Sequence, residues 1–303
     1  MRPFDFQKWT SLHQSRIEEL LVKRFEGRQV ENLSVACQYP IKTGGKRFRP
    51  LLVYASLAAC TSELSYKTLL PQADLCAQAV ELIHTYSLVH DDLPCMDNDD
   101  FRRGHPTVHK AFSEDIAILV GDSLLTEAFL AIANLPNDKI AQVLRWLSNY
   151  SGIDGMVGGQ SIDIGFEGGF PNLDTDESDE HYQVRRNQNL NTLTKLHRLK
   201  TGALIELSVV MGAYIAGLRG PELDPLKKFG QAVGLGFQLA DDVLDAEEDQ
   251  KADGPPSFVK LVGIDQTKTL ASEQLQIALE TTNTLVNPEP LRALARFSVK
   301  RLS

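Results

Sequence analysis

Residues 69–97 read LLPQADLCAQAVELIHTYSLVHDDLPCMD and hold both the strongest helical signal of the chain and its first acidic cluster. Over 69–89 apolar residues occur on almost every side of a helix, at Leu70, Ala73, Cys76, Ala77, Val80, Ile83 and Leu88. A helix that is apolar all round is buried. We therefore expect a central buried helix here, inside an all-α fold.

Helical patterning continues through most of the remaining chain, and convincing period-2 strands are absent from the sequence. We expect one domain over 1–303, with further helices near 4–24, 50–60, 113–133, 138–150, 153–165, 184–217, 223–247, 265–282 and 289–301. The segment 167–181 is rich in Gly, Pro and acidic residues and is typical of a surface loop.

Composition excludes several classes of protein. The 303 residues are 43% hydrophobic, which is enough for a large core, and the net charge of −9 argues against general binding of nucleic acid. No run approaches 18 apolar residues, and the first residues lack a signal-peptide core, so we expect a cytoplasmic protein without membrane insertion. The four cysteines have no CxxC spacing and are expected to be reduced thiols.

Two acidic clusters end apolar helices, one with Asp91, Asp92 and Asp97 and the other with Asp241, Asp242 and Asp245. Carboxylates are costly to bury unless a cation or hydrogen-bond donors compensate them. Oxygen ligands without a nearby Cys or His set favour a hard cation, and magnesium, which shares its coordination with phosphates, fits best. The alternative is that each cluster is an ordinary solvated helix end.

Helical geometry supports the metal interpretation unequally in the two clusters. Asp241 and Asp245 lie only ~40° apart around a helix, so both can point at one ion. Asp91 and Asp97 would differ by roughly 240° on a regular helix. Because Pro94 disturbs the helix between them, a bulge or an early helix end could return Asp97 to the side of Asp91.

Basic and polar residues accompany these acids. The stretch 44–50, GGKRFRP, places Lys46, Arg47 and Arg49 before an apolar helix, where an external anion would explain them better than the helix dipole does. A solvated basic turn is the alternative. His84 lies two helical turns before Asp91 and is either a core histidine or a phosphate ligand. The glycines 158 and 159, next to Gln160, permit close approach of another helix.

Together these stretches resemble the trans-isoprenyl diphosphate synthases, most closely the bacterial farnesyl diphosphate synthase type. The resemblance rests on motifs in the family's order, GKRFRP at 45–50, HTYSLVHDDLPCMDNDDFRRG at 84–104, GGQSID at 158–163, KTG at 200–202 and FQLADDVLD at 237–245. It implies an isoprenoid-synthase-type helical bundle around a central cavity, and a homodimer.

The same resemblance implies head-to-tail condensation of isopentenyl diphosphate with dimethylallyl or geranyl diphosphate. Magnesium, three ions per site, would be held by Asp91, Asp97 and Asp241, with Asp92 and Asp245 assisting. Contacts to the allylic diphosphate or its cation would come from Arg102, Lys200, Thr201 and Gln238. The diphosphate of isopentenyl diphosphate would be held by Lys46, Arg49, His84 and Arg103.

Product length is expected to depend on Tyr86, five residues before Asp91. In the family this position projects into the product tunnel, and a bulky aromatic resembles a floor that stops growth at farnesyl diphosphate (C15). An ordinary core tyrosine is the alternative, and with it a geranylgeranyl diphosphate (C20) product. Two further alternatives are a class I terpene cyclase, which needs no isopentenyl site, and a non-catalytic synthase subunit, which would be expected to have lost acidic ligands.

Two features depart from the family pattern. Pro255 stands where relatives often carry a lysine after the second acidic motif, with Lys251 or Lys260 as possible substitutes. The region 167–190 is longer than in compact relatives, and the sequence predicts no function for it. The basic C-terminal residues Lys300 and Arg301 either cap the site, as in relatives, or form a solvated helix end.

Overall fold

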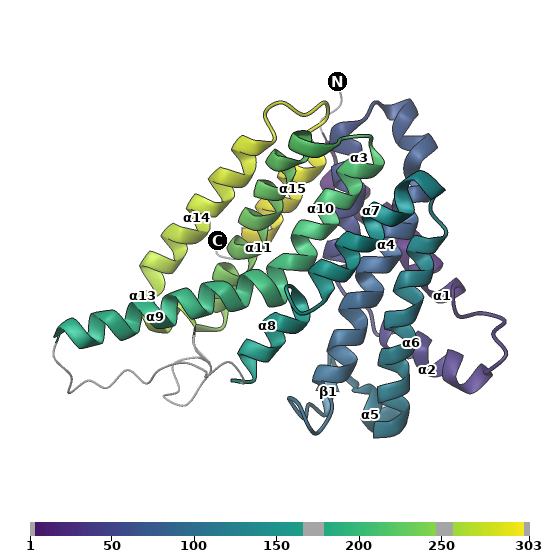
Figure 1. Ribbon diagram of the computed structural model, residues 1–303, viewed down its shortest axis with the longest axis horizontal. Helices are drawn as coiled ribbons and strands as arrows, with labels where there is room; N and C mark the ends of the chain where they lie inside the picture. The colour runs from purple at the N-terminus through teal and green to yellow at the C-terminus, as the bar shows by residue number, and fades with distance from the viewer. Residues whose placement is uncertain (1–3, 166–178, 247–256, 300–303) are drawn as a thin grey trace. The chain divides into compact units, whose positions relative to one another are not determined.

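The structure is a computed structural model that describes residues 4–165, 179–246 and 257–299, without side-chain detail for 179–182. It is built almost entirely of helices (Figure 1). The helices are α1 (Phe6–Lys23), α2 (Glu31–Lys42), α3 (Phe48–Cys60), α4 (Glu63–Asp91), α5 (Val108–Ala111), α6 (Glu114–Ala133), α7 (Asn137–Ser151), α8 (Met156–Asp163), α9 (Asp179–His197), the π-helix η1 (Arg198–Gly202), α10 (Ala203–Ile215), the 3₁₀-helix η2 (Gly220–Leu223), α11 (Asp224–Leu244), α13 (Phe258–Val262), α14 (Ile264–Thr281) and α15 (Glu289–Val299).

A small antiparallel hairpin is the only sheet within the described residues. Its strands β1 (Phe101–Arg102) and β2 (His105–Pro106) follow the first acidic cluster. Phe101 pairs with Pro106, and Arg102 pairs with His105. The all-α prediction is thus confirmed.

Two compact units make up the chain, the first formed by 1–147 with 211–218 and the second by 148–210 with 219–303. The prediction of one domain over 1–303 is not tested by this division and stays a prediction.

The first unit is organised around α4, which packs against α3 and α6 (Figure 1). Ser62 caps α4 by accepting a hydrogen bond from the backbone N–H of Ser65, which satisfies one of the open donors of the first turn. Every residue from 76 to 83 is buried, as expected for a helix without a polar face. The predicted central helix is therefore present and is longer than expected.

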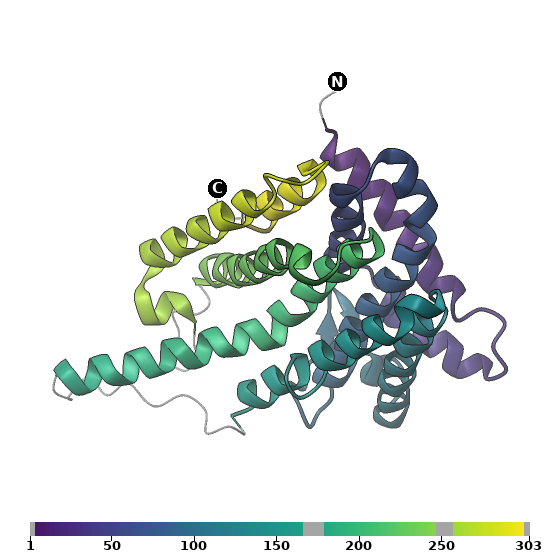
Figure 2. The same cartoon turned by 45° about the horizontal axis from the view of Figure 1, so that its top comes forward.

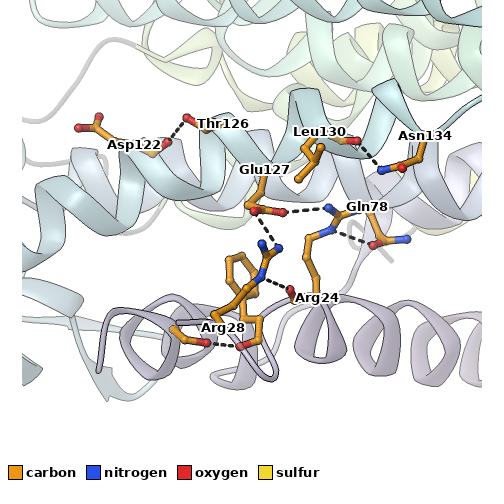
Figure 3. A network of polar contacts seen from close by, with 10 residues as sticks. Arg24, Arg28, Gln78, Asp122, Thr126, Glu127, Leu130 and Asn134 are labelled. Atoms are coloured by element: carbon orange, nitrogen blue, oxygen red, sulfur yellow. Dashed lines mark hydrogen bonds and ion pairs between the residues drawn. The ribbon is translucent and has the colours of Figure 1, made fainter. Parts of the chain in front are cut away.

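A partly buried polar network joins three segments of this unit (Figure 3). Glu127 of α6 accepts Nη1 of Arg24 at 2.9 Å and Nη2 of Arg28 at 2.8 Å. Arg24 also donates from Nε to Gln78 of α4 at 3.1 Å. Because each buried group has a partner, the network ties the end of α1 to α4 and α6 without leaving an uncompensated charge.

The second unit is organised around α11, which packs against α14, η1 and α15 (Figure 2). Its apolar core gathers side chains from five helices, namely Leu193, Leu239, Phe258, Leu261, Ala271 and Val299. Glycines on α11 admit the neighbouring backbone: a Cβ at Gly234 would lie 2.9 Å from Cα of Gly202. Such contact distances require glycine and bring α11 directly against the π-helix.

Three elements differ from the predictions. Residues 31–42, for which no helix was predicted, form α2, and residues 258–262 form α13. The expected helix over 184–217 is α9 and α10 joined by the π-helix η1, which inserts an extra residue into the helical repeat. Within the described residues α6 is long and apolar enough to cross a membrane by length and composition, a test that a core helix of a soluble protein also passes.

Candidate functional site

The first acidic motif lies where α4 ends. The helix stops at Asp91, and the chain then turns so that the N–H of Asp97 donates to the carbonyl of Asp91 at 2.8 Å. The N–H of Asn98, in left-handed backbone conformation, donates to the carbonyl of Leu93 at 3.1 Å. This turn around Pro94 brings the backbones of Asp91 and Asp97 together. The early helix end that the sequence suggested is therefore confirmed.

Asp92 has a different role from its neighbour. Its side chain is buried and accepts Nε of Arg102 at 2.7 Å, and Nη2 of Arg102 lies 2.6 Å from the same oxygen. Burial raises the pKa of Asp92, and the guanidinium acts against this rise. Arg102 also contacts Asp99 at 3.2 Å. The pair anchors β1 to the end of α4, so Asp92 positions Arg102, and its predicted binding of metal stays a prediction.

The basic stretch before α3 divides its side chains between the interior and the site. Arg47, with a left-handed φ of 49°, sends its guanidinium inward to Glu81 at 3.0 Å and Glu18 at 3.2 Å. Lys46 is exposed. Arg49 differs from both, because its buried Nε has no hydrogen-bond partner within the described residues. Burial lowers the pKa of Arg49 to about 10.

Arg103 and His84 join Arg49. Arg103 donates to the carbonyl of Gly44, and a Cβ at Gly45 would lie 2.6 Å from its Nη1, so only glycine leaves room for this guanidinium. The pKa of His84 is held well below its usual value by burial and then by the charges of Arg49 and Arg103. His84 is therefore neutral. A partly buried cluster with this excess of positive charge is suited to an anionic ligand.

The second acidic motif lies at the end of α11. Asp245 follows the last helical residue and donates its N–H to the carbonyl of Asp241 at 2.9 Å. Burial, together with the charges of Asp245 and Asp242, raises the pKa of Asp241 to about 7. Gln238 is half-buried one turn earlier. The carboxylates repel one another, which is the electrostatic condition that a bound divalent cation relieves.

Asp242, in the same motif, has a structural partner. Its buried carboxylate accepts the backbone N–H of Phe258 at 2.7 Å, and Ser257 caps the same short helix by accepting from the N–H of Lys260. Asp242 thus fixes the start of α13. The sequence analysis counted Asp242 in the second acidic cluster, and the resemblance did not imply it as a metal ligand; here its carboxylate holds the start of α13.

The π-helix positions Lys200 and Thr201. A Cβ at Gly159 of α8 would lie 2.6 Å from Cα of Lys200, which confirms the close approach expected from paired glycines. Lys200 forms an ion pair with Asp163. The side-chain nitrogen and oxygen of Gln160 are buried without a hydrogen-bond partner among the described residues. Unsatisfied buried amide groups are rare and indicate a site for a polar ligand or water.

His197 was missed by the sequence analysis. It stacks on Phe258 with ring centroids 5.6 Å apart, and its buried Nε2 has no hydrogen-bond partner in the part of the chain that the structure describes. Burial lowers its pKa to about 4. Its position three residues before Lys200 is the only sequence signal that could have indicated it.

Tyr86 is buried on α4, and burial raises its pKa, with the charge of Asp91 adding to the effect. Its ring meets His90 edge to face at a centroid distance of 5.8 Å. Pro255, Lys251, residues 167–178, Lys300 and Arg301 lie outside the described residues. Of the extended region 167–190, residues 179–190 form the first part of α9.

Comparison with known proteins gives this geometry a family. The family model described as Polyprenyl synthetase matches residues 30–286. The chain belongs to the polyprenyl synthetase family. The recognition of a trans-isoprenyl diphosphate synthase is thereby confirmed, and this member of the family is a prenyltransferase.

Curated relatives in the family carry two product names. The chain is 36% identical to farnesyl diphosphate synthase of Haemophilus influenzae over 307 residues, covering 96% of each protein. It is equally 36% identical to geranylgeranyl diphosphate synthase of Cyanophora paradoxa over 325 residues, covering 99% of each. Family membership therefore establishes prenyl transfer and leaves the length of the product to be assigned.

Solved structures share the fold. A farnesyl/geranylfarnesyl diphosphate synthase from Zymomonas mobilis matches with a TM-score of 0.81 and 34% identity, covering 97% of this chain and 98% of that one. Geranyltransferase from Helicobacter pylori, complexed with magnesium and isoprenyl diphosphate, matches with a TM-score of 0.71 and 32% identity, covering 97% and 96%. The polyprenyl synthetase fold thus extends over nearly the whole chain.

Proposed function

We propose that this prenyltransferase condenses isopentenyl diphosphate head-to-tail with dimethylallyl diphosphate and then geranyl diphosphate, to give farnesyl diphosphate. The observation that carries the proposal is the partly buried cationic cluster beside the first acidic motif. The buried Nε of Arg49 has no hydrogen-bond partner among the described residues. Burial, and then the charges of the surrounding arginines, hold the pKa of His84 well below its usual value. A diphosphate supplies the negative charge that this cluster lacks.

Magnesium is the proposed cofactor. Within the described residues no three acidic, His or Cys side chains form a complete metal site by themselves. This fits an ion that is bound by one or two carboxylates and completed by substrate phosphate oxygens and water. Asp91 and Asp97 on one motif, and Asp241 and Asp245 on the other, offer oxygen donors only, with three ions proposed per site. Bound magnesium would neutralise the departing diphosphate.

The isopentenyl diphosphate would be held by Arg49, Arg103 and His84, with exposed Lys46 at the entrance. Arg49 and Arg103 present guanidinium groups that match phosphate oxygens in pairs. Neutral His84 can donate one ring N–H to a phosphate oxygen. Because Arg49 and His84 are partly desolvated before the ligand arrives, their interaction with it is stronger than it would be in water.

The allylic substrate would be placed by Arg102, Lys200, Thr201 and Gln238. The C–O bond at its C1 breaks, and the electron pair leaves with the diphosphate. The double bond of isopentenyl diphosphate then attacks C1, a proton is lost from the adjacent carbon, and the released diphosphate accepts it. In this scheme the protein supplies positioning and charge stabilisation, and no protein side chain acts as general base.

Assignment of the C15 product rests on Tyr86. It is a large aromatic residue on α4, buried one and a half turns before Asp91. The second candidate, a C20 product, is favoured by the relatives that are named geranylgeranyl diphosphate synthases. The purified protein with magnesium, isopentenyl and dimethylallyl diphosphate should yield C15 as the main product, and Tyr86→Ala should lengthen it. An unchanged length in that variant would reject Tyr86 as the floor.

Assembly as a homodimer in the cytoplasm completes the proposal. Two apolar residues on one face of α6, Leu119 and Leu130, are 48% and 45% exposed. Their burial in a dimer interface would be favourable. Sedimentation should show a dimer, and Leu119→Glu should weaken it. A wild-type protein that sediments as a monomer at all concentrations would contradict this part.

A further inference from the structure

His90, the residue directly before Asp91, lies on α4 and packs against α6 in the first unit. Its Nε2 lies 3.2 Å from the carbonyl oxygen of Ile118 on α6. Directly beneath the imidazole is Gly121 of α6. A Cβ built at that glycine would overlap Nε2, Cδ2 and Cε1 of the ring. The backbone of α6 therefore forms a notch at residue 121 that holds the His90 side chain.

The ring of His90 also contacts the ring of Tyr86. The two residues are four apart on α4, so their side chains lie on one face of the helix. The rings meet at 5.8 Å with an interplanar angle of 77°, the edge-to-face arrangement that aromatic pairs prefer. The ring of Tyr86 is thus braced by His90, and His90 is braced by the notch.

We propose that His90 and Gly121 are specificity-determining positioning residues that hold Tyr86 as the floor of the product site. This rests on the proposed function, in which Tyr86 limits the product to C15. Neither residue needs to touch the substrate. Without the brace, the Tyr86 ring can turn into the space that His90 vacates, and the site becomes deep enough for one further isoprene unit.

Product ratios test the brace directly. His90→Ala should raise the ratio of C20 to C15 product by about twofold to tenfold, the range expected for losing an aromatic pair. His90→Phe keeps a ring in the notch and against Tyr86, and should stay close to the wild-type ratio. His90→Gln keeps a donor for the Ile118 carbonyl without the ring, and should behave like His90→Ala. The ratio is internal to each assay, so slower turnover beside Asp91 does not affect it.

Gly121 provides the second arm. Gly121→Ala forces the imidazole out of the notch and should lower Tm by about 2 to 5 °C, with a rise in the C20 share. In the His90→Ala background the added methyl group has room, so Gly121→Ala should change neither Tm nor product ratio. Additive effects of the two substitutions on Tm and on the product ratio would overturn the proposed packing of His90 against Gly121.

Other outcomes separate this inference from the proposed function. If Tyr86→Ala lengthens the product and His90→Ala does not, the brace is wrong and the floor stands. If neither variant alters length while prenyl transfer proceeds, both the floor and the brace are overturned. If the wild-type protein forms no prenyl diphosphate, the proposed function fails, and non-additive Tm values would still support the packing of His90 in the notch.

Discussion

Both acidic motifs contain two adjacent aspartates, and in both the second aspartate is buried while the first is only half-buried. The buried members have different partners: Asp92 binds the guanidinium of Arg102, whereas Asp242 binds the backbone N–H of Phe258. Adjacent residues on a helix point about 100° apart, so one can serve the site while the other serves the fold. In each motif, one aspartate therefore holds the local structure, and the other remains available to the site.

The motifs also differ in their electrostatic surroundings. The first is accompanied by arginines at β1 and at the start of α3, and burial together with their charges lowers the pKa of His84. In the second, burial and neighbouring carboxylates raise the pKa of Asp241 to about 7. The first motif therefore belongs to a site with built-in positive charge, and the second depends more strongly on a cation that binds from solution.

The largest expected effect distinguishes the first aspartate of each motif from an ordinary surface acid. Asp91→Asn and Asp241→Asn should each lower kcat about 100- to 1000-fold, because each removes a charge that supports departure of the diphosphate. Both variants should remain folded by circular dichroism. Asp138→Asn, at an exposed position on α7, is the matched control and should retain activity. Wild-type turnover in both motif variants would refute the assignment of metal ligands.

Next in size is the effect of removing the guanidinium of Arg49, whose buried Nε has no hydrogen-bond partner among the described residues. Arg49→Gln should weaken binding of inorganic diphosphate without magnesium by about tenfold to 100-fold, since a hydrogen bond to a charged group is lost. Calorimetry at low ionic strength measures this. Arg145→Gln on the exposed part of α7 controls for net charge. Equal affinities for the Arg49 variant and the wild type would show that the cluster is not an anion site.

A smaller effect should separate Asp92 from Asp242. Asp92→Asn breaks a partly buried ion pair and should cost about 2 kcal/mol of unfolding free energy, reduced from the fully buried value because Arg102 is partly exposed. Asp242→Asn keeps an oxygen that accepts from Phe258 and should cost less than about 1 kcal/mol. Urea denaturation of both variants checks the order. The reverse order would contradict the roles given to the two residues.

The smallest effect concerns pH and the second unit. Because burial lowers the pKa of His197 to about 4, the unfolded chain takes up this proton first as pH falls below about 6.5. Stability should therefore fall by about 1 to 2 kcal/mol between pH 6.5 and 4.5 through this residue. His197→Phe, which keeps a ring against Phe258, should lose that part of the pH dependence. An unchanged slope would mean that the pKa of His197 is not lowered in the folded protein.

The sequence predicted helix positions correctly where apolar periodicity was strong, as in α4. It missed helices whose formation depends on tertiary contacts. The segment of α2 has Pro40 in its last turn and was not predicted, yet it forms against α6. The five residues of α13 depend on caps from Asp242 and Ser257. Short helices are marginal without such contacts, so local sequence cannot indicate them.

Residue chemistry and spacing by themselves predicted the helical class, the family and the joint presence of acidic and basic groups, and they left open a bulge or an early helix end between Asp91 and Asp97. Those conclusions depend on geometry and charge within short stretches of consecutive residues. Only the tertiary structure decided that Arg47 pairs with Glu81 and Glu18 while the Nε of Arg49 has no partner among the described residues. It also decided that Asp92 and Asp242 hold structural partners, and that a glycine on α6 receives His90. Each depends on which atoms a distant segment brings within a few ångströms, and that is set by packing of the whole fold.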